Sequence, residues 1–444
     1  MTKIADHLIS PKWIAPVMPK SCVLENHSVA ILGGRIIEIQ KTKDILRNYP
    51  TTRNVSLPNH LLTPGFINTH SHAAMTLLRG IADDRNMMDW LSNWIWPIES
   101  KLVDKDFVYD GTLLAGIEMI KGGTTTVADS YFYPDASAKA YEALSLRAQI
   151  GIPVLKFDNS WARGEKEHIS RGLELHFQLR NDGLKKVALA PHAPYSVSDE
   201  GFKSMLQISE KHDLRVQLHL HETNQEISDS ELEWGTRPIA RLEKLGFLNE
   251  RLQAVHLTQL TQSEIDLLAV RGIQVSHCPE SNMKLGSGIC PLAKLRAAGI
   301  NVAIGTDGAA SNNDLDMLQE VRTASFLSKA VTNDATTPSA FDCLEMITLN
   351  GARFLGLEQN IGSIEKGKEA DLTAIDLSSI IHQPIYNPVS QLIYNCTAND
   401  ITNVWIKGKQ LLKNRQLCLF EAGDLDKNVE NWKTRILNII EDMP

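Results

Sequence analysis

From residue 64 to residue 308, short apolar runs alternate with longer segments of helical character. Such an alternation predicts a parallel β/α array. Eight runs are strand candidates: Pro64–His72, Thr124–Tyr131, Ile152–Asn159, Lys186–Tyr195, Arg215–Glu222, Leu252–Gln259, Gly272–Asn282 and Asn301–Gly308. Eight strands with intervening helices indicate the α/β class and a (β/α)8, TIM-like barrel, in which functional residues gather at the carboxyl ends of the strands.

The two ends of the chain differ from this middle part and contain short β-rich runs. Neither group is large enough to bury a core alone, so we predict one small β-sandwich domain formed by both ends. We place this domain at residues 1–63 and 362–420, the barrel at 64–361 and a C-terminal helix within 421–444. The strand candidates are Trp13–Val17, Ser28–Leu32, Arg35–Ile39, Ala370–Asp376 and Val404–Lys409, with a Gly33-Gly34 hairpin turn before the third.

The first barrel strand ends in two histidines, His70 and His72. Side chains at positions i and i+2 of a strand lie on the same face, so both imidazoles project together and suit two ligands of one metal ion. Burial within the core is the ordinary explanation for any single histidine, but seven histidines on one rim favour a functional site. The later strand ends carry His192, His219, His221, Glu222, His256, His277 and Asp307.

Three imidazole nitrogens and one carboxylate oxygen are a typical ligand set for zinc or a similar divalent ion with one open position. His70, His72 and Asp307 supply three of these four ligands. Strand alternation fails where a strand becomes a loop, so spacing leaves both His219 and His221 open as the fourth. The end of the fourth strand has no lysine to bridge a second ion, so we expect one metal ion per chain.

The composition excludes some classes of partner. The net charge is -8, and no basic tract is present that would follow a nucleic-acid backbone. The six cysteines form no Cys-x-x-Cys pair, which favours reduced thiols in a cytosol over a disulfide scaffold. The amino terminus has no apolar signal region, and no run approaches the roughly 18 apolar residues of a membrane span. We therefore expect a cytoplasmic protein without nucleic-acid or membrane partners.

Several stretches together resemble the amidohydrolase superfamily and, within it, the 5′-methylthioadenosine/S-adenosylhomocysteine deaminases. The resemblance covers nearly the whole chain, and the order and combination of these stretches are specific to the superfamily. They are PGFINTHSHAAMTLLRGIADD (Pro64–Asp84), WLSNWIWPIE (Trp90–Glu99), HLHETNQE (His219–Glu226), SHCPESNMKLGSG (Ser276–Gly288), GTDGAASNNDLDM (Gly305–Met317) and GSIEKGKEADLTAID (Gly362–Asp376).

The resemblance implies a role for each site residue. It implies one zinc ion, or another divalent ion, held by His70, His72, His219 and Asp307. It implies that Glu222 carries protons, and that His256 and Asp307 orient the attacking water. It also places Glu99 at the ribose hydroxyls, His192 against the nucleoside and Ser311 beside Asp307 or the substrate. The arginines with which the family holds a homocysteine carboxylate have no clear match here: Arg163 and Arg171 lie in the right region, with solvated helix-surface charges as the alternative.

The implied reaction is hydrolytic deamination of 5′-methylthioadenosine, S-adenosylhomocysteine or adenosine to the inosyl product and ammonia, by a homo-oligomeric enzyme. The alternative within the same architecture is a guanine deaminase or a triazine hydrolase. Glu99 discriminates between them, because a bare heterocycle has no hydroxyls for a ribose-binding carboxylate. A non-enzymatic metal-binding or scaffold protein is a third possibility, against which Glu222 and His256 speak, since neither is needed to hold a metal.

Overall fold

A computed structural model describes residues 3–418 and 423–443 of the chain. These residues form two compact units. The first comprises residues up to 68, 118–126 and 316–418, and the second comprises 69–117, 127–315 and 423–443. The domain bounds expected from the sequence stay a prediction. None of the described helices is long and apolar enough to span a lipid bilayer.

An eight-stranded sheet, most of whose residues lie in the second unit, forms a nearly closed barrel in the order β13-β12-β11-β10-β9-β8-β7-β6. Its ends approach each other where the Asp307 amide donates to the His70 carbonyl at 3.0 Å. This confirms the (β/α)8 fold class. The strands are β6 (Phe66–Ser71), β7 (Thr124–Ser130), β8 (Arg147–Val154), β9 (Lys185–Pro191), β10 (Val216–Leu220), β11 (Leu252–His256), β12 (Gln274–His277) and β13 (Val302–Ile304).

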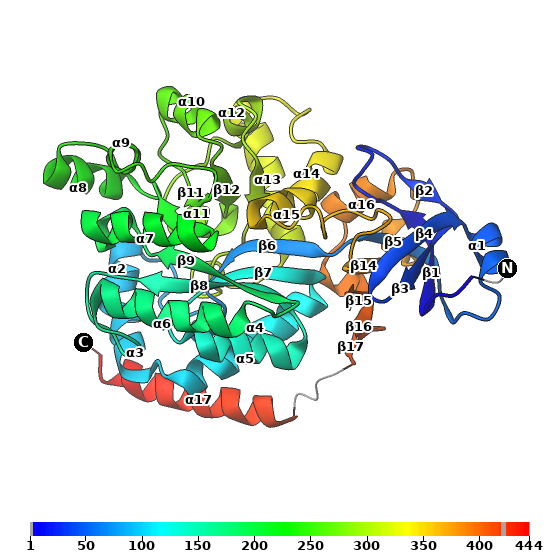
Figure 1. The fold of residues 1–444 in the computed structure, drawn as a ribbon, viewed down its shortest axis with the longest axis horizontal. Coiled ribbons are helices and arrows are strands. Elements are labelled where there is room, and N and C mark those ends of the chain that lie inside the picture. The colour runs from blue at the N-terminus through cyan, green and yellow to red at the C-terminus, as the bar shows by residue number, and fades with distance from the viewer. Residues whose placement is uncertain (1–2, 419–422, 444) are drawn as a thin grey trace. The chain divides into compact units, whose positions relative to one another are not determined.

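Helices separate successive barrel strands, as the alternation predicts (Figure 1). Between β6 and β7 lie the 3-10 helix η1 (Ala73–Leu78), α2 (Met87–Trp90), the π-helical turn η2 (Leu91–Ile95), α3 (Trp96–Leu102) and α4 (Lys105–Lys121). The later helices are α5 (Pro134–Leu144), α6 (Gly164–Leu179), η3 (Pro194–Ser196), α7 (Asp199–His212), α8 (Asn224–Trp234), α9 (Pro238–Lys244), α10 (Gln262–Val270), α11 (Pro279–Lys284) and α12 (Leu292–Ala297).

The C-terminal helix α17 (Gly423–Glu441) lies along α3 in the second unit (Figure 1). Its Trp432 donates from Nε1 to Asp110 Oδ2 at 2.9 Å. Trp432 also packs in one apolar cluster with Trp90 and Ile95, residues that line the cavity described below. The helix therefore stabilises the α2–α3 wall of that cavity.

Both chain ends contribute to one mixed sheet in the first unit, with the order β17-β16-β15-β14-β5-β1-β3-β4 and with β2 paired to β1. This confirms a small β region built from both ends. Gly33 and Gly34 have φ values of 57° and 77°, which the predicted hairpin turn requires. The strands are β1 (His7–Ile14), β2 (Leu24–Glu25), β3 (His27–Leu32), β4 (Arg35–Lys41), β5 (Asn54–Pro64), β14 (Leu372–Asp376), β15 (Ile401–Ile406), β16 (Lys409–Lys413) and β17 (Gln416–Leu417).

Helices complete the first unit. They are α1 (Thr42–Asn48), α13 (Met317–Thr332), α14 (Ala340–Met346), α15 (Leu349–Leu355), η4 (Ile380–His382), α16 (Pro388–Tyr394) and η5 (Ala398–Asp400).

Candidate active site

A cavity of about 650 Å³ opens at the carboxyl ends of the barrel strands, and all the residues that line it belong to the second unit. Its volume lies in the range of small-molecule sites. Nine of the ten site residues assigned from the resemblance line it: His70, His72, Glu99, His192, His219, Glu222, His256, Asp307 and Ser311. Five of the seven histidines expected at the strand ends therefore share one cavity with Glu222 and Asp307.

Three imidazoles converge at the strand ends. His219 Nε2 lies 3.1 Å from His70 Nε2 and 3.2 Å from His72 Nε2. Asp307 Oδ1 lies 3.3 Å from Nε2 of both His70 and His72. The structure thus brings His219, and not His221, into the group.

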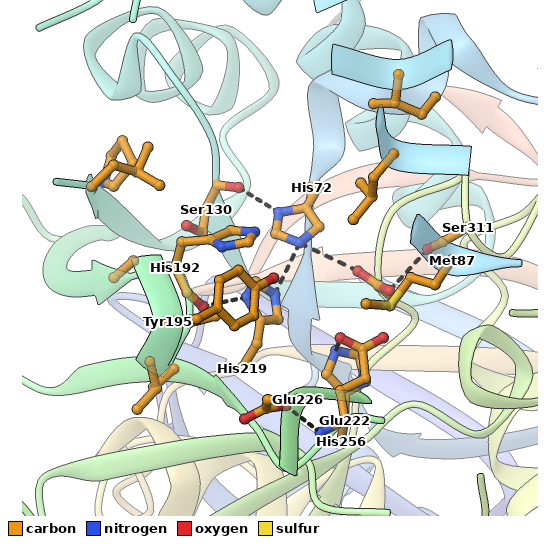
Figure 2. Close-up of a pocket in the computed structure, with 18 of the residues that line it drawn as sticks. His72, Met87, Ser130, His192, Tyr195, His219, Glu222, Glu226, His256 and Ser311 are labelled. Atoms are coloured by element: carbon orange, nitrogen blue, oxygen red, sulfur yellow. Dashed lines mark hydrogen bonds and ion pairs between the residues drawn. The ribbon is translucent and has the colours of Figure 1, made fainter. Parts of the chain in front are cut away.

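Nδ1, the other nitrogen of each of these rings, forms a hydrogen bond with an oxygen that can act only as an acceptor. His70 Nδ1 donates to Gln217 Oε1 at 2.9 Å, and His219 Nδ1 donates to the His192 carbonyl at 2.6 Å. His72 Nδ1 donates to the Ser130 carbonyl at 2.6 Å, a contact that Figure 2 shows together with the approach of His72 to His219. In the neutral rings the proton is therefore on Nδ1, and all three Nε2 lone pairs point at one another.

This arrangement fits a divalent metal ion. Lone pairs facing each other at such distances repel unless a cation lies between them. Ligands at the corners of a tetrahedron, each about 2.0–2.1 Å from zinc, are about 3.3–3.4 Å apart. The four separations given above, 3.1 Å and 3.2 Å from His219 and 3.3 Å from Asp307 to each of His70 and His72, are close to that spacing. Backbone and amide acceptors behind metal-binding imidazoles are the usual means of fixing their orientation.

Asp307 is fixed by groups that leave Oδ1 directed at the histidines. Its Oδ2 accepts hydrogen bonds from Ser281 Oγ at 2.7 Å and Ser311 Oγ at 2.8 Å. Burial would raise the pKa of Asp307, but the surrounding histidines, His70 foremost, hold it well below its usual range. Ser311 therefore contacts the carboxylate from behind while also lining the cavity.

Glu222 is held at its backbone and at its side chain. Its amide donates to Glu226 Oε2 at 2.8 Å, and its carbonyl accepts from Thr258 Oγ1 at 2.6 Å. Ser287 Oγ donates to Glu222 Oε1 at 3.3 Å. Burial raises the pKa of Glu222 to about 8, and the negative charge of Asp307 adds to the shift. At neutral pH this carboxyl group can hold a proton and release it.

Two further histidines face the same space. His256 donates from Nδ1 to Asn282 Oδ1 at 2.9 Å, which leaves Nε2 as an acceptor 3.7 Å from Glu222 Oε2. Burial lowers the pKa of His192 to about 4, so its ring is neutral at pH 7. Neutral His256 can therefore accept a hydrogen bond at Nε2, and His192 contacts the cavity as an uncharged ring.

Glu99 reaches the cavity from α3. Its Oε1 accepts a hydrogen bond of 2.5 Å from the hydroxyl of Tyr131, at the end of β7. Burial raises the pKa of Glu99 to about 7, against the opposing effects of Tyr131 and His72. The remaining oxygen, Oε2, is available to a ligand in the cavity.

Three residues singled out in the sequence lie elsewhere. His221 has a φ of 54°, which turns it out of the strand, and its Nε2 accepts from the Ile239 amide at 3.1 Å. His277 is buried beside the site but does not line the cavity. Arg163 is exposed at the start of α6 and is also not among the lining residues.

The sequence reasoning missed Gln217, Tyr131 and Glu226. Gln217 holds His70 from Oε1 and donates from Nε2 to the Thr69 carbonyl at 3.0 Å. It lies two residues before His219, so strand alternation could have placed both on one face. Glu226 accepts from the His221 amide at 3.0 Å as well as from the Glu222 amide. No local pattern distinguishes such a glutamate from an ordinary one in the first turn of a helix.

Comparison with known proteins agrees with this geometry. The model of the amidohydrolase family matches residues 61–411. The chain belongs to the amidohydrolase family. A 5-methylthioadenosine/S-adenosylhomocysteine deaminase of Saccharophagus degradans is 44% identical over 97% of both chains. A 5′-deoxyadenosine deaminase of Methanosphaera stadtmanae is 38% identical over 90% of this chain and 93% of its own.

Among solved structures, an adenosine deaminase of Xanthomonas campestris with bound zinc is 47% identical, with a TM-score of 0.96 over 98% of this chain and 99% of its own. An atrazine chlorohydrolase of Arthrobacter aurescens, at 24% identity and a TM-score of 0.88, covers 96% of this chain and 99% of its own. A guanine deaminase of C. acetobutylicum, at 21% identity and a TM-score of 0.81, covers 91% of this chain and 99% of its own. The last two similarities establish a shared fold alone.

Proposed function

We propose that this amidohydrolase hydrolyses the 6-amino group of adenine nucleosides such as 5′-methylthioadenosine, giving the inosyl product and ammonia. One observation carries the proposal: three convergent imidazoles and Asp307 share a cavity with Glu222 and Glu99. The imidazoles and Asp307 are suited to a metal ion, Glu222 to proton transfer and Glu99 to a ribose. Deaminase relatives that match over nearly the full length support the same reaction.

His70, His72, His219 and Asp307 would hold one divalent ion, and the zinc of the similar adenosine deaminase supports zinc as that ion. Bound there, zinc would supply Lewis-acid activation of a water molecule at neutral pH. Gln217, Ser130 and the His192 carbonyl keep the three imidazoles oriented. Ser281 and Ser311 do the same for Asp307.

Glu222 moves the protons. With its pKa raised to about 8 by burial, it donates to the purine ring nitrogen next to C6 as that carbon becomes tetrahedral. It then takes part in the transfer of a proton to the departing amine. His256 accepts at Nε2 and orients the attacking water, because its Nδ1 proton is committed to Asn282.

Glu99 and His192 recognise the nucleoside. Glu99 Oε2 accepts from the ribose hydroxyls while Tyr131 holds Oε1. A charged hydrogen bond of this kind is worth roughly 1.5–3 kcal/mol. The neutral ring of His192 lies against the base. A contact between Arg163 and the 5′ substituent stays a prediction from the sequence and forms no part of this proposal.

We further propose that the enzyme is cytoplasmic and homo-oligomeric and that it has no nucleic-acid or membrane partners. These points rest on the expectations drawn from the sequence, and light scattering during gel filtration would test the oligomeric state.

A nucleoside panel tests the proposed reaction. The zinc-loaded enzyme should release ammonia from 5′-methylthioadenosine and adenosine with a far higher kcat/KM than from free adenine or 2′,3′-dideoxyadenosine, which lack the paired hydroxyls. Glu99→Ala should remove most of this preference and leave the zinc content unchanged. If guanine or a triazine is the best substrate, the nucleoside proposal fails.

A further inference from the structure

Glu222, the proton carrier of the proposed reaction, is held at three of its polar groups. Its amide donates to Glu226 Oε2 at 2.8 Å (Figure 2). Its carbonyl accepts from Thr258 Oγ1 at 2.6 Å, and Oε1 of its carboxyl group accepts from Ser287 Oγ at 3.3 Å. The other carboxyl oxygen, Oε2, faces His256, whose Nε2 lies 3.7 Å away. The position of Oε2 in the cavity is therefore set by the backbone from which Glu222 projects.

The backbone just before Glu222 has an unfavourable conformation. His221 has a φ of 54°, in the left-handed region that costs free energy for residues other than glycine. This turn leads from the end of β10 toward α8 and directs the Glu222 side chain into the cavity. Glu226, in the first turn of α8, stabilises the turn with both carboxyl oxygens, because Oε1 accepts from the His221 amide at 3.0 Å and Oε2 accepts from the Glu222 amide.

Glu226 differs from the carboxylate of an ordinary capping box. In such a box, the carboxylate three residues after the N-cap accepts from the backbone amide of the N-cap itself. Glu264 does so with the Thr261 amide at 2.8 Å, at the start of α10. Glu226 also follows its N-cap, Thr223, by three residues, but its carboxyl group reaches past Thr223 to the two preceding amides. Its hydrogen bonds therefore stabilise the turn that carries Glu222, while the Thr223 hydroxyl caps the helix.

Two amide donors require two acceptor atoms at residue 226. The carboxyl group of Glu226 supplies both, whereas a glutamine of the same length would offer one acceptor and would turn an amide donor toward the second N–H group. The side chain of Glu226 is only 7% exposed, so water has little access to replace a lost hydrogen bond. The geometry of the turn therefore depends on a carboxyl group at this position.

We infer that Glu226 is a positioning residue for Glu222: by holding the His221 and Glu222 amides, it keeps Glu222 Oε2 where this oxygen exchanges a proton with the purine. The inference rests on the proposed nucleoside deamination. Glu226 then acts on the chemical step and contributes neither to zinc binding nor to the affinity for the nucleoside. Its replacement should accordingly lower kcat and leave KM and zinc content nearly unchanged.

Glu226→Gln, made in wild type and in Glu222→Gln, tests the inference with 5′-methylthioadenosine as substrate. A displacement of a catalytic group by about 1 Å can cost 10²-fold in rate, so in wild type kcat should fall on the order of tenfold to 10²-fold, with KM and zinc content unchanged. In Glu222→Gln the same change should lower kcat further by less than about twofold, because a residue that acts through the Glu222 carboxyl group then has no catalytic group to position.

Asp342→Asn is the matched control. Asp342 occupies the same helical position in an ordinary capping box of the first unit, where it accepts from the Ser339 amide at 2.9 Å at the start of α14. Its replacement should leave kcat as in wild type, even where it lowers the melting temperature. If Glu226→Gln does not fold, Glu226→Asp takes its place in both backgrounds, because it keeps two carboxyl oxygens on a side chain that is one methylene group shorter.

The possible outcomes are separable. A wild-type kcat after Glu226→Gln, or a loss of zinc, would overturn the inference while leaving the deaminase proposal intact. An equal loss of kcat in the wild-type and Glu222→Gln backgrounds would also overturn it, because the effect would then not pass through Glu222. Failure of the wild-type enzyme to deaminate any nucleoside of the panel would instead overturn the proposed function itself.

Discussion

Two parts of this protein bring potential metal ligands within 4.8 Å of one another. In the barrel group these are the triads His70, His72, His219 and His70, His256, Asp307, and in the second cluster, in the first unit, they are His382, Cys396 and Asp400. By residue type alone, both could bind a divalent ion. Their hydrogen bonds distinguish them.

In the barrel group, oxygens behind the rings fix each Nδ1 proton and leave three lone pairs directed at one point. In the second cluster, one ring lies between two oxygens: His382 Nδ1 contacts Asn395 Oδ1 at 2.5 Å, and Nε2 contacts Asp400 Oδ1 at 3.1 Å. Burial also raises the pKa of Cys396 to about 12, which keeps the thiol protonated. The direction of the lone pairs, rather than the residue types, identifies the metal site.

Removing a ligand should abolish zinc binding and activity in the barrel group but should leave both unchanged in the second cluster. His72→Ala should lower zinc from one ion per chain to almost none and abolish turnover, because two imidazoles and one carboxylate remain. Cys396→Ala should retain both zinc and activity. Elemental analysis together with ammonia release measures both variants, and loss of zinc in Cys396→Ala would show that the second cluster is also a metal site.

Glu222→Gln should separate metal binding from catalysis. The amide cannot exchange the proton that the reaction requires, so kcat should fall on the order of 10²-fold or more while zinc stays at one per chain. Steady-state kinetics on protein of measured metal content checks this. A nearly normal kcat would rule out Glu222 as the proton carrier.

The side chains that accept hydrogen bonds from the histidine Nδ1 atoms should affect zinc affinity in the barrel group alone. Gln217→Leu removes the acceptor of His70 Nδ1 and should weaken zinc affinity about 10–100-fold, the usual effect of losing such a partner. Asn395→Leu removes the equivalent acceptor of His382 and should not change zinc affinity. Competition with a chromophoric chelator measures both constants, and equal effects would remove the distinction between the clusters.

The pH dependence of kcat/KM should be the smallest of these effects. Glu99, with a pKa raised to about 7, accepts from ribose hydroxyls only when ionised, so kcat/KM should fall as the pH drops through 7. Glu222, with a pKa raised to about 8, loses its proton above that value, so kcat/KM should also fall on the alkaline side. Glu99→Gln should abolish the acidic limb alone. A flat profile between pH 6 and 9 (about one unit beyond each pKa) would contradict both assignments.

The sequence was enough to predict the eight barrel strands but not all of their limits. The third strand was expected at Ile152–Asn159, whereas β8 spans Arg147–Val154. Its first half carries Arg147 and Gln149, which are buried, and Gln149 donates to Gln253 Oε1 at 2.7 Å inside the barrel. Polar residues paired across a barrel interior leave no apolar run in the sequence.

The limits of other strands depend on backbone conformation. His256 and Asp307 have φ values of 75° and 61°, which direct these side chains to the site beyond the end of each strand. Such left-handed conformations cost free energy for residues other than glycine and occur where tertiary contacts impose them. Spacing could therefore suggest the ligand set but could not separate His219 from His221, and it gave no sign of Tyr131.

Anomalous scattering at the zinc edge from crystals of active enzyme, with the zinc content of the same preparation, tests the metal site. The expected result is one ion per chain, bound by Nε2 of His70, His72 and His219 and by Asp307 Oδ1, with no peak at His382, Cys396 and Asp400. Two bridged ions at the barrel, or an active preparation without any ion, would contradict the account.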